Sequence, residues 1–218
     1  MKQFLPVLVG AIVLLSSCSK ETIHGSGSLG AEKRQVPSFT QVEVSGDSEV
    51  SIVYDSTQEV TINGYQNLLP IYETEVRGST LYLHYRDEDY RVTNGNVKVA
   101  IHLPVLAGVQ VHGSGKANVL NFSNGDILNT SINGSGNMTI AESRYNMATY
   151  AINGSGEIQA ATNIAKEANA QISGSGKIEL HATGKLKATI SGSGEITYWG
   201  SPANVDTQIN GSGRITKN

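Results

Sequence analysis

Apolar and polar residues alternate through the second half of the chain, around a Gly-Ser-Gly triplet that recurs every 18 to 21 residues. A polar residue flanks each triplet on either side, and an apolar residue stands one step further out. Alternation with period two is typical of β-strands, and a fixed repeat of about 20 residues predicts stacked strands. The glycines of the triplets are Gly113 and Gly115, Gly134 and Gly136, Gly154 and Gly156, Gly174 and Gly176, Gly192 and Gly194, and Gly211 and Gly213.

Alignment on the triplets produces two apolar columns. A unit of about 20 residues cannot form a core alone, so we expect each coil to bury these side chains against the next coil. The column before the triplet holds Val111, Ile132, Ile152, Ile172, Ile190 and Ile209, and the column after it holds Ala117, Met138, Ile158, Ile178, Ile196 and Ile215.

Glycine at two positions of every unit requires a structural cause. Either the backbone turns there, or another backbone lies too close for a side chain, and the pattern leaves both readings open. The residue after the triplet alternates in sign over the last four units, which neighbouring strands in register would favour. These residues are Glu157, Lys177, Glu195 and Arg214.

The pattern predicts an all-β chain folded as a parallel β-solenoid, a right-handed β-helix with coils of about 18–21 residues. Calcium-binding nonapeptide arrays are excluded because no aspartate follows the triplets at the required place, and the left-handed hexapeptide helix is excluded because no six-residue period is present. A β-sandwich remains open, since regularly spaced short strands also describe one.

The first half of the predicted fold, residues 39–106, repeats less clearly. The segment Ser45–Val50 resembles a decayed copy of Ser191–Ile196, and Thr61–Gly64 repeats Ser131–Gly134. This region therefore consists either of degenerate coils or of a separate β-lobe. Regular coils are expected over residues 107–218.

The amino terminus has the pattern of a bacterial lipoprotein signal. Lys2 precedes an apolar run from Phe4 to Leu15 that is too short to span a bilayer, so residues 1–17 are predicted to be a signal peptide. The run ends in Leu15-Ser16-Ser17-Cys18, which resembles a lipobox and implies lipidation of Cys18. Residues 18–38, rich in glycine and serine, are predicted to be the lipidated cysteine and a flexible tether. Ser19 is compatible with sorting to the outer membrane.

Composition excludes several functions. Charged residues make up 16% of the chain and the formal net charge is −3, so no basic surface for nucleic acid is expected. A single cysteine cannot form an internal disulfide, and no Cys or His spacing fits zinc. No cofactor and no catalytic residue are predicted, because a serine repeated six times is a turn residue and not a nucleophile. The acidic stretch Arg86–Arg91 is interpreted as a solvated loop in preference to a cation site.

One aromatic pair is a candidate ligand contact. Tyr198 and Trp199 precede Gly200-Ser201-Pro202 and are expected in a loop between coils, where their rings could stack on a sugar or on a protein partner. The alternative is that Trp199 folds over the end of the coil and is partly buried.

The repeated Ile-Asn-Gly-Ser-Gly and Ile-Ser-Gly-Ser-Gly segments, following Phe39–Val44 and preceded by a lipobox, resemble the lipid-anchored "head GIN domain" proteins of Bacteroidetes. That family is described as "putative auto-transporter adhesins". The resemblance covers the chain from about Phe39 onward and implies a β-solenoid at the cell envelope.

The sequence therefore predicts an outer-membrane lipoprotein, on the cell surface or the periplasmic face, that acts without catalysis as an adhesin or ligand-binding solenoid. Its expected partners are the membrane, through the lipid, and a glycan or protein. The alternatives are a periplasm-facing structural or sensing lipoprotein and a carbohydrate-active β-helix enzyme. The segment after the last triplet, with Arg214 and Lys217, is expected either to guard a terminal strand or to form a homo-oligomer contact.

Overall fold

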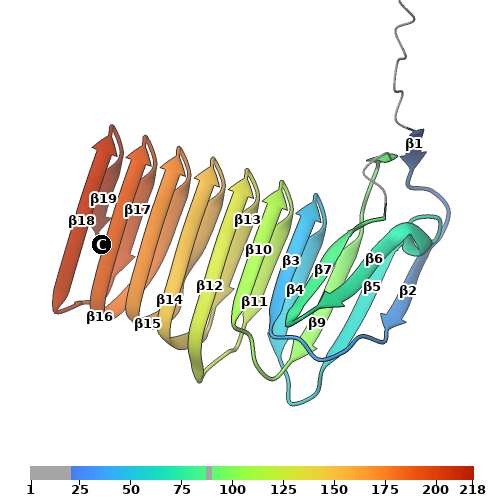
Figure 1. The fold of residues 1–218 in the computed structure, drawn as a ribbon, viewed down its shortest axis with the longest axis horizontal. Coiled ribbons are helices and arrows are strands. Elements are labelled where there is room, and N and C mark those ends of the chain that lie inside the picture. Colours follow the sequence, from blue (N-terminus) through green and yellow to red (C-terminus); the bar gives the residue numbers. More distant parts are fainter. Residues whose placement is uncertain (1–20, 87–89) are drawn as a thin grey trace, which may run out of the picture.

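The fold is a stack of β-strand coils in two layers (Figure 1). The structure, a computed structural model, describes residues 21–86 and 90–218. Short segments without strand structure join the strands, and a 3-10 turn lies at Leu69–Ile71. The strands are β1 (Glu21–His24), β2 (Leu29–Arg34), β3 (Gln41–Gly46), β4 (Glu49–Tyr54), β5 (Glu59–Tyr65), β6 (Tyr72–Arg77), β7 (Thr80–Tyr85), β8 (Tyr90–Thr93), β9 (Lys98–Leu103), β10 (Gly108–Gly113), β11 (Lys116–Leu120), β12 (Gly125–Gly134), β13 (Asn137–Ala141), β14 (Ser143–Gly154), β15 (Glu157–Gly174), β16 (Lys177–Gly192), β17 (Glu195–Trp199), β18 (Asn204–Gly211) and β19 (Arg214–Lys217).

Each regular coil contributes one strand to each layer. Sheet I contains the strands that lead into the triplets: β10, β12, β14, the second halves of β15 and β16, and β18. Sheet II contains those that leave them: β11, β13, the first halves of β15 and β16, β17 and β19. All of these neighbours pair in parallel, which confirms the predicted parallel β-solenoid; its handedness stays a prediction.

The triplet is the corner between the two sheets, and its backbone continues the hydrogen-bond ladder around the corner. The Ser175 amide donates to the carbonyl oxygen of Gly154 at 2.9 Å, and the Lys177 amide donates to that of Gly156 at 3.0 Å. Equivalent bonds join every pair of successive triplets. The triplets therefore lie directly on one another, which fixes the register of each coil.

The two glycines of a triplet serve different purposes. The first has a φ between +107° and +133° in all six copies, a conformation that favours glycine, and a Cβ there would overlap the carbonyl oxygen of the glycine one coil before. The third is buried in the first five copies, and a Cβ on Gly176 would lie 2.6 Å from Cγ2 of Ile152. Both readings left open by the sequence therefore apply to the first glycine, whereas the third is limited by the isoleucine and the backbone of the coil before.

The predicted apolar columns form the core between the sheets. In the column before the triplet, the five residues from Val111 to Ile190 are at most 1% exposed, and so are the five from Ala117 to Ile196 in the other column. In the last coil Ile209 is 43% exposed, and Ile215 is only partly buried.

Residues 41–103 combine further coils with antiparallel strands. Strands β3 and β4 form a coil that stacks in parallel on β10 and β11, so the decayed copy at Ser45–Val50 occupies a true corner. On the other side of this coil, β7 and β9 also pair with it in parallel. Strands β6, β5 and β2 then add antiparallel partners at this end of the stack (Figure 1). The first half is therefore neither a plain continuation of the coils nor a separate lobe.

One expectation near the amino terminus is wrong. Residues 21–34 are not a flexible tether, because β1 pairs with β8, and β2 pairs with β5 over six residues. The Thr61–Gly64 copy is not a corner, because it lies inside the antiparallel strand β5, where Gly64 packs against Val97.

In the described part of the chain, no helix has the length and apolar character needed to cross a membrane.

Replacing the first glycine of a central triplet should destabilise the fold. In Gly174→Ala the new Cβ would overlap the Gly154 carbonyl at a φ of +131°, so we expect the free energy of unfolding to fall by at least about 2 kcal/mol. The matched control is Ser175→Ala, since Ser175 is exposed in the same triplet and should change stability by less than about 0.5 kcal/mol. Urea unfolding followed by circular dichroism measures both. Equal stability of the two variants would show that the close approach of the backbones does not restrain the fold.

The buried tyrosines should make the fold sensitive to alkali. Burial raises the pKa of Tyr150, whose hydroxyl accepts a hydrogen bond from Asn163 Nδ2 at 2.7 Å, and burial also raises the pKa of Tyr72 and Tyr145, and that of Tyr85 to about 12. These pKa values exceed the unfolded value of about 10, so the unfolded chain loses its tyrosine protons at a lower pH than the folded chain does. The stability that burial of the neutral tyrosines contributes to the fold is therefore complete below pH 10 and is lost as pH rises above it. We expect the free energy of unfolding to fall by about 1.4 kcal/mol per pH unit for Tyr150 alone between pH 10 and 12.

Absorbance of tyrosinate during a pH titration provides the measurement. Four of the nine tyrosines should resist ionisation at pH 11 until urea unfolds the chain. Ionisation of all nine near pH 10 in the folded protein would contradict the prediction.

Candidate functional site

The two outer faces of the solenoid differ in chemistry. On sheet I, the three outward positions that precede the triplet in each of β12, β14 and β15 carry amides, hydroxyls and one alanine, and none of these nine side chains is charged. Charged side chains flank this patch, since Glu167 lies further from the triplet in β15 and Lys187 pairs with Asn169 on the next coil. The amides are linked between coils, since Asn153 Nδ2 donates to Asn133 Oδ1 at 2.9 Å. This patch offers hydrogen-bond donors and acceptors. Its outward residues are Asn129, Ser131, Asn133, Thr149, Ala151, Asn153, Asn169, Gln171 and Ser173.

Sheet II carries the charged column. In register along it, Glu157 pairs with Lys177, Lys177 with Glu195, and Glu195 with Arg214, as the alternation of sign predicted. Asn137 interrupts the charges, and beyond it the alternation resumes at the other end of the stack: Lys116 pairs with Glu49, and Glu49 with Lys98, whose Nζ lies 3.1 Å from Glu49 Oε2. The alternating charges stabilise neighbouring strands, although exposed pairs contribute less than about 1 kcal/mol each.

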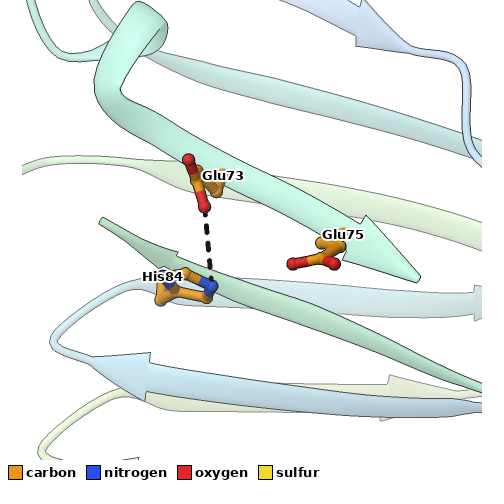
Figure 2. Close-up of side chains that lie close together, drawn as sticks. All are labelled: Glu73, Glu75 and His84. Atoms are coloured by element: carbon orange, nitrogen blue, oxygen red, sulfur yellow. Dashed lines mark ion pairs between the residues drawn. The ribbon is translucent and has the colours of Figure 1, made fainter. Parts of the chain in front are cut away.

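A third polar group lies on the last strand pair of sheet I. Glu73 and Glu75 project from β6, and His84 projects from β7 directly opposite Glu73 (Figure 2). One ligand atom from each lies within 4.8 Å of the others, a spacing that could hold a metal ion. His84 Nδ1 donates to the carbonyl oxygen of Tyr85 at 2.9 Å, so its Nε2 faces Glu73 at 3.9 Å.

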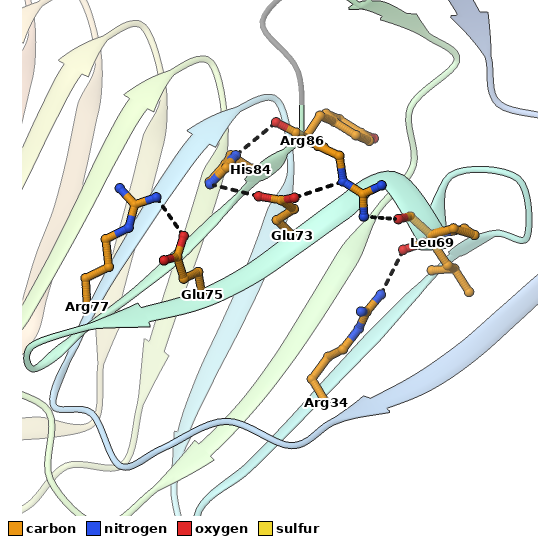
Figure 3. Close-up of polar contacts among 9 residues, drawn as sticks. Arg34, Leu69, Glu73, Glu75, Arg77, His84 and Arg86 are labelled. Atoms are coloured by element: carbon orange, nitrogen blue, oxygen red, sulfur yellow. Dashed lines mark hydrogen bonds and ion pairs between the residues drawn. The ribbon is translucent and has the colours of Figure 1, made fainter.

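Both carboxylates of this group form ion pairs with arginines (Figure 3). Arg86 Nε lies 2.9 Å from Glu73 Oε1 and its other end donates to the carbonyl oxygen of Pro70, while Arg77 lies 2.6 Å from Glu75. The hydrogen bond from Arg77 lowers the pKa of Glu75, so this carboxylate stays ionised and paired. A metal would have to displace two guanidinium groups, and we interpret the cluster as an ion-pair network on an edge strand.

A hollow of about 560 Å³ lies at the opposite corner of the coils from the triplets, where the segment between β9 and β10 meets the turn between β11 and β12. Its apolar wall contains Tyr54, Val105, Phe122, Ile127 and Tyr145, and its polar wall contains Ser123, Asn124 and Asp126.

Hydrogen bonds between distant segments hold the wall of the hollow. Tyr145 Oη donates to the carbonyl oxygen of Leu106 at 3.3 Å, and the Ala107 amide donates to that of Thr40 at 2.7 Å. Gly125 pairs with Tyr145, whose ring fills the space that a side chain on Gly125 would need. The hollow is therefore preformed, as small-molecule sites usually are.

The predicted site residues do not converge. The twelve triplet glycines are structural corners, as expected. Tyr198 and Trp199 are not in a loop but are the last two residues of β17, and both are partly buried, with Tyr198 packed against the core. Cys18 and the acidic residues 87–89 lie outside the described residues.

Sequence analysis missed the hollow. The only signal was the interval of 21 residues between Gly113 and Gly134, the longest of the five, which indicates extra residues in that coil. Its walls come from Tyr54, from residues 104–107 and 122–127, and from Tyr145, and none of these segments belongs to the repeated triplet.

Solved structures share this fold. A "putative adhesin" from Bacteroides fragilis superposes with a TM-score of 0.71 at 23% identity, with 90% of this chain and 100% of that chain covered. A "putative lipid binding protein" from Parabacteroides distasonis has a TM-score of 0.63 at 22% identity, covering 91% and 100% of the two chains. A "putative adhesin" from Parabacteroides merdae has a TM-score of 0.55 at 24% identity, covering 91% and 99%. At these identities the likeness shows the fold alone.

No curated protein sequence matches the chain. A family model does match it, over residues 38–202, which include β3 to β17 and five of the six triplets. The segments that resembled the family in sequence are the corners of the observed coils. The chain belongs to the family described as "Putative auto-transporter adhesin, head GIN domain".

Proposed function

We propose that this chain is a lipid-anchored, non-enzymatic binding protein of the cell envelope, displayed on the outer surface, where it acts as an adhesin for a glycan or a protein. Membership of an adhesin family supports a role at the envelope. The lipobox ending at Cys18 supports the anchor, and the short apolar run before it supports export. The observation that carries the proposal is the stack itself, which presents a patch of nine uncharged outward side chains on sheet I.

A binding role suits the chemistry of that face. Amide and hydroxyl side chains repeat along the stack at the spacing of neighbouring strands, about 4.8 Å. Such a surface can form many weak hydrogen bonds to an extended ligand that itself carries hydroxyl or amide groups. No single contact has to be strong for the whole surface to retain a ligand.

The carboxylates favour a non-enzymatic role. Glycoside hydrolysis needs two carboxyl groups held apart across a bond, one of them protonated. Here Glu73 and Glu75 are held by arginines, Glu59 by Lys33 and Glu167 by Lys185. The pKa of Glu59 is lowered by its hydrogen bond to Lys33, the opposite of what a catalytic acid requires.

Replacement of Cys18 should release the chain from the membrane. In Cys18→Ser no thiol is available for acylation, and the lost acyl chains each contribute about 0.8 kcal/mol per buried methylene to membrane attachment. We expect the variant to move to the soluble fraction and to lose labelling by a palmitate analogue, while Ser17→Ala, which keeps a small residue before the cysteine, stays labelled. Fractionation with in-gel detection measures both. Labelled, membrane-bound Cys18→Ser protein would overturn the anchor.

Protease treatment of intact cells tests the surface location. We expect proteinase K to remove the chain from intact cells while a soluble periplasmic protein in the same cells stays protected, because the proposed display places the solenoid outside the outer membrane. The measurement is an immunoblot of whole cells before and after treatment. Protection of the chain until the outer membrane is permeabilised would favour the periplasm-facing alternative. Release of reducing ends or unsaturated products from a polysaccharide by the purified chain would contradict the non-enzymatic part of the proposal.

A further inference from the structure

We propose that the hollow lined by Tyr54, Val105, Ile127, Asn124 and Asp126 is a saccharide-binding site, in which one sugar ring stacks on Tyr54 and its hydroxyl groups bond to Asp126 and Asn124. The inference rests on the proposed binding function and gives it a location and a ligand class. It also replaces Tyr198 and Trp199 as the aromatic site of the chain.

The first argument is the exposure of the apolar wall. Six large apolar side chains are exposed in the described part of the chain, and three of them, Tyr54, Val105 and Ile127, line this one hollow at 50%, 57% and 44% exposure. Exposed apolar side chains scattered singly need no explanation, whereas their concentration around a cavity indicates a binding site. The volume, about 560 Å³, lies within the range of small-molecule sites.

The second argument is the position of the aromatic rings. Tyr54 ends strand β4, and its ring packs edge-to-face with the buried ring of Phe122, with centroids 6.0 Å apart. This contact supports the Tyr54 ring from one side while half of the side chain stays open to solvent. An aromatic ring that is held in place and exposed can stack against the apolar face of a ligand whose polar groups lie around its edge.

The third argument is the polar wall beside it. Ser123 and Asn124 lie in the turn that joins β11 and β12, and Asp126 is the second residue of β12. Asn146 Nδ2 of the next coil donates to Asp126 Oδ1 at 2.9 Å. That bond orients the Asp126 carboxylate, which has acceptor capacity for further hydrogen bonds from a ligand. A hydroxyl group can both donate to this carboxylate and accept from the Asn124 amide.

A saccharide matches both walls at once. A pyranose ring has an apolar face of C–H groups and a periphery of hydroxyls, so it satisfies the aromatic and the polar side of the hollow together. An acyl chain would cover the apolar wall but would leave Ser123, Asn124 and Asp126 beside hydrocarbon, which costs free energy unless they keep their water.

The test is ligand binding by the purified full chain and four variants. The probes are the methyl glycosides of glucose, galactose, mannose and N-acetylglucosamine, with palmitate for comparison, followed by saturation-transfer NMR. For at least one glycoside we expect Tyr54→Ala and Asp126→Ala to weaken binding at least tenfold, Tyr54→Phe to stay within threefold, and Trp199→Ala to match the wild type. The thermal midpoint of each variant shows whether it is folded, and retained binding by Tyr54→Phe separates loss of the ring from loss of the fold.

Three results would overturn the inference: no glycoside binds better to the wild type than to Tyr54→Ala, palmitate alone binds and depends on Tyr54, or glycoside binding depends on Trp199 and not on Tyr54. Each of these leaves the proposed function intact if protease still removes the chain from intact cells. Protection of the chain from protease in intact cells would overturn the surface location and would leave the proposed saccharide site unaffected.

Discussion

Two successive corners of this solenoid lie so close together that neither glycine of the triplet tolerates a side chain. The first glycine adopts a positive φ with the carbonyl of the previous corner against its α-carbon, and the third makes room for the isoleucine one coil before. Because the corner amides bond to the carbonyls of the corner before, the register of both sheets is fixed at the same point. The isoleucine columns inside and the charged column on sheet II follow from that register.

The stack does not grow from one end of the chain to the other. The coil of β3 and β4 is formed early in the sequence, and the chain then builds outward from both of its sides, with β7 and β9 on one side and β10 and β11 on the other. Antiparallel strands β6, β5 and β2 cover the first of these sides, and charged pairs such as Arg77 with Glu75 and Lys33 with Glu59 lie along them. Charged side chains on outer strands discourage pairing with other chains.

Function is best supported where the repeat is interrupted. In the central coils, the outer face of sheet I repeats amide and hydroxyl side chains from coil to coil, which suits a broad surface of many weak contacts. The hollow arises where the chain returns from β9 and meets the longest coil interval, so it combines side chains that occur once. A regular scaffold that carries an irregular pocket can hold an extended ligand along its face and recognise one ring of it at the corner.

Pattern alone determined the solenoid, the buried columns and the paired charges, because each depends on contacts that recur at a fixed interval and are therefore visible as columns. Only the tertiary structure showed that the first glycine of the triplet has a positive φ and that the third lies against an isoleucine of the coil before. In the sequence, a glycine looks the same in either case. The tertiary structure also showed that the Gly-Ser-rich segment after Cys18 contains strand β2, because partners from β5 satisfy a backbone whose own composition predicts flexibility. The hollow depended most on the tertiary structure: Tyr54 lies about 50 residues before Val105 in the chain, and only the stacking of β4 on β9 and β11 brings it to the corner where Val105 and Ile127 lie.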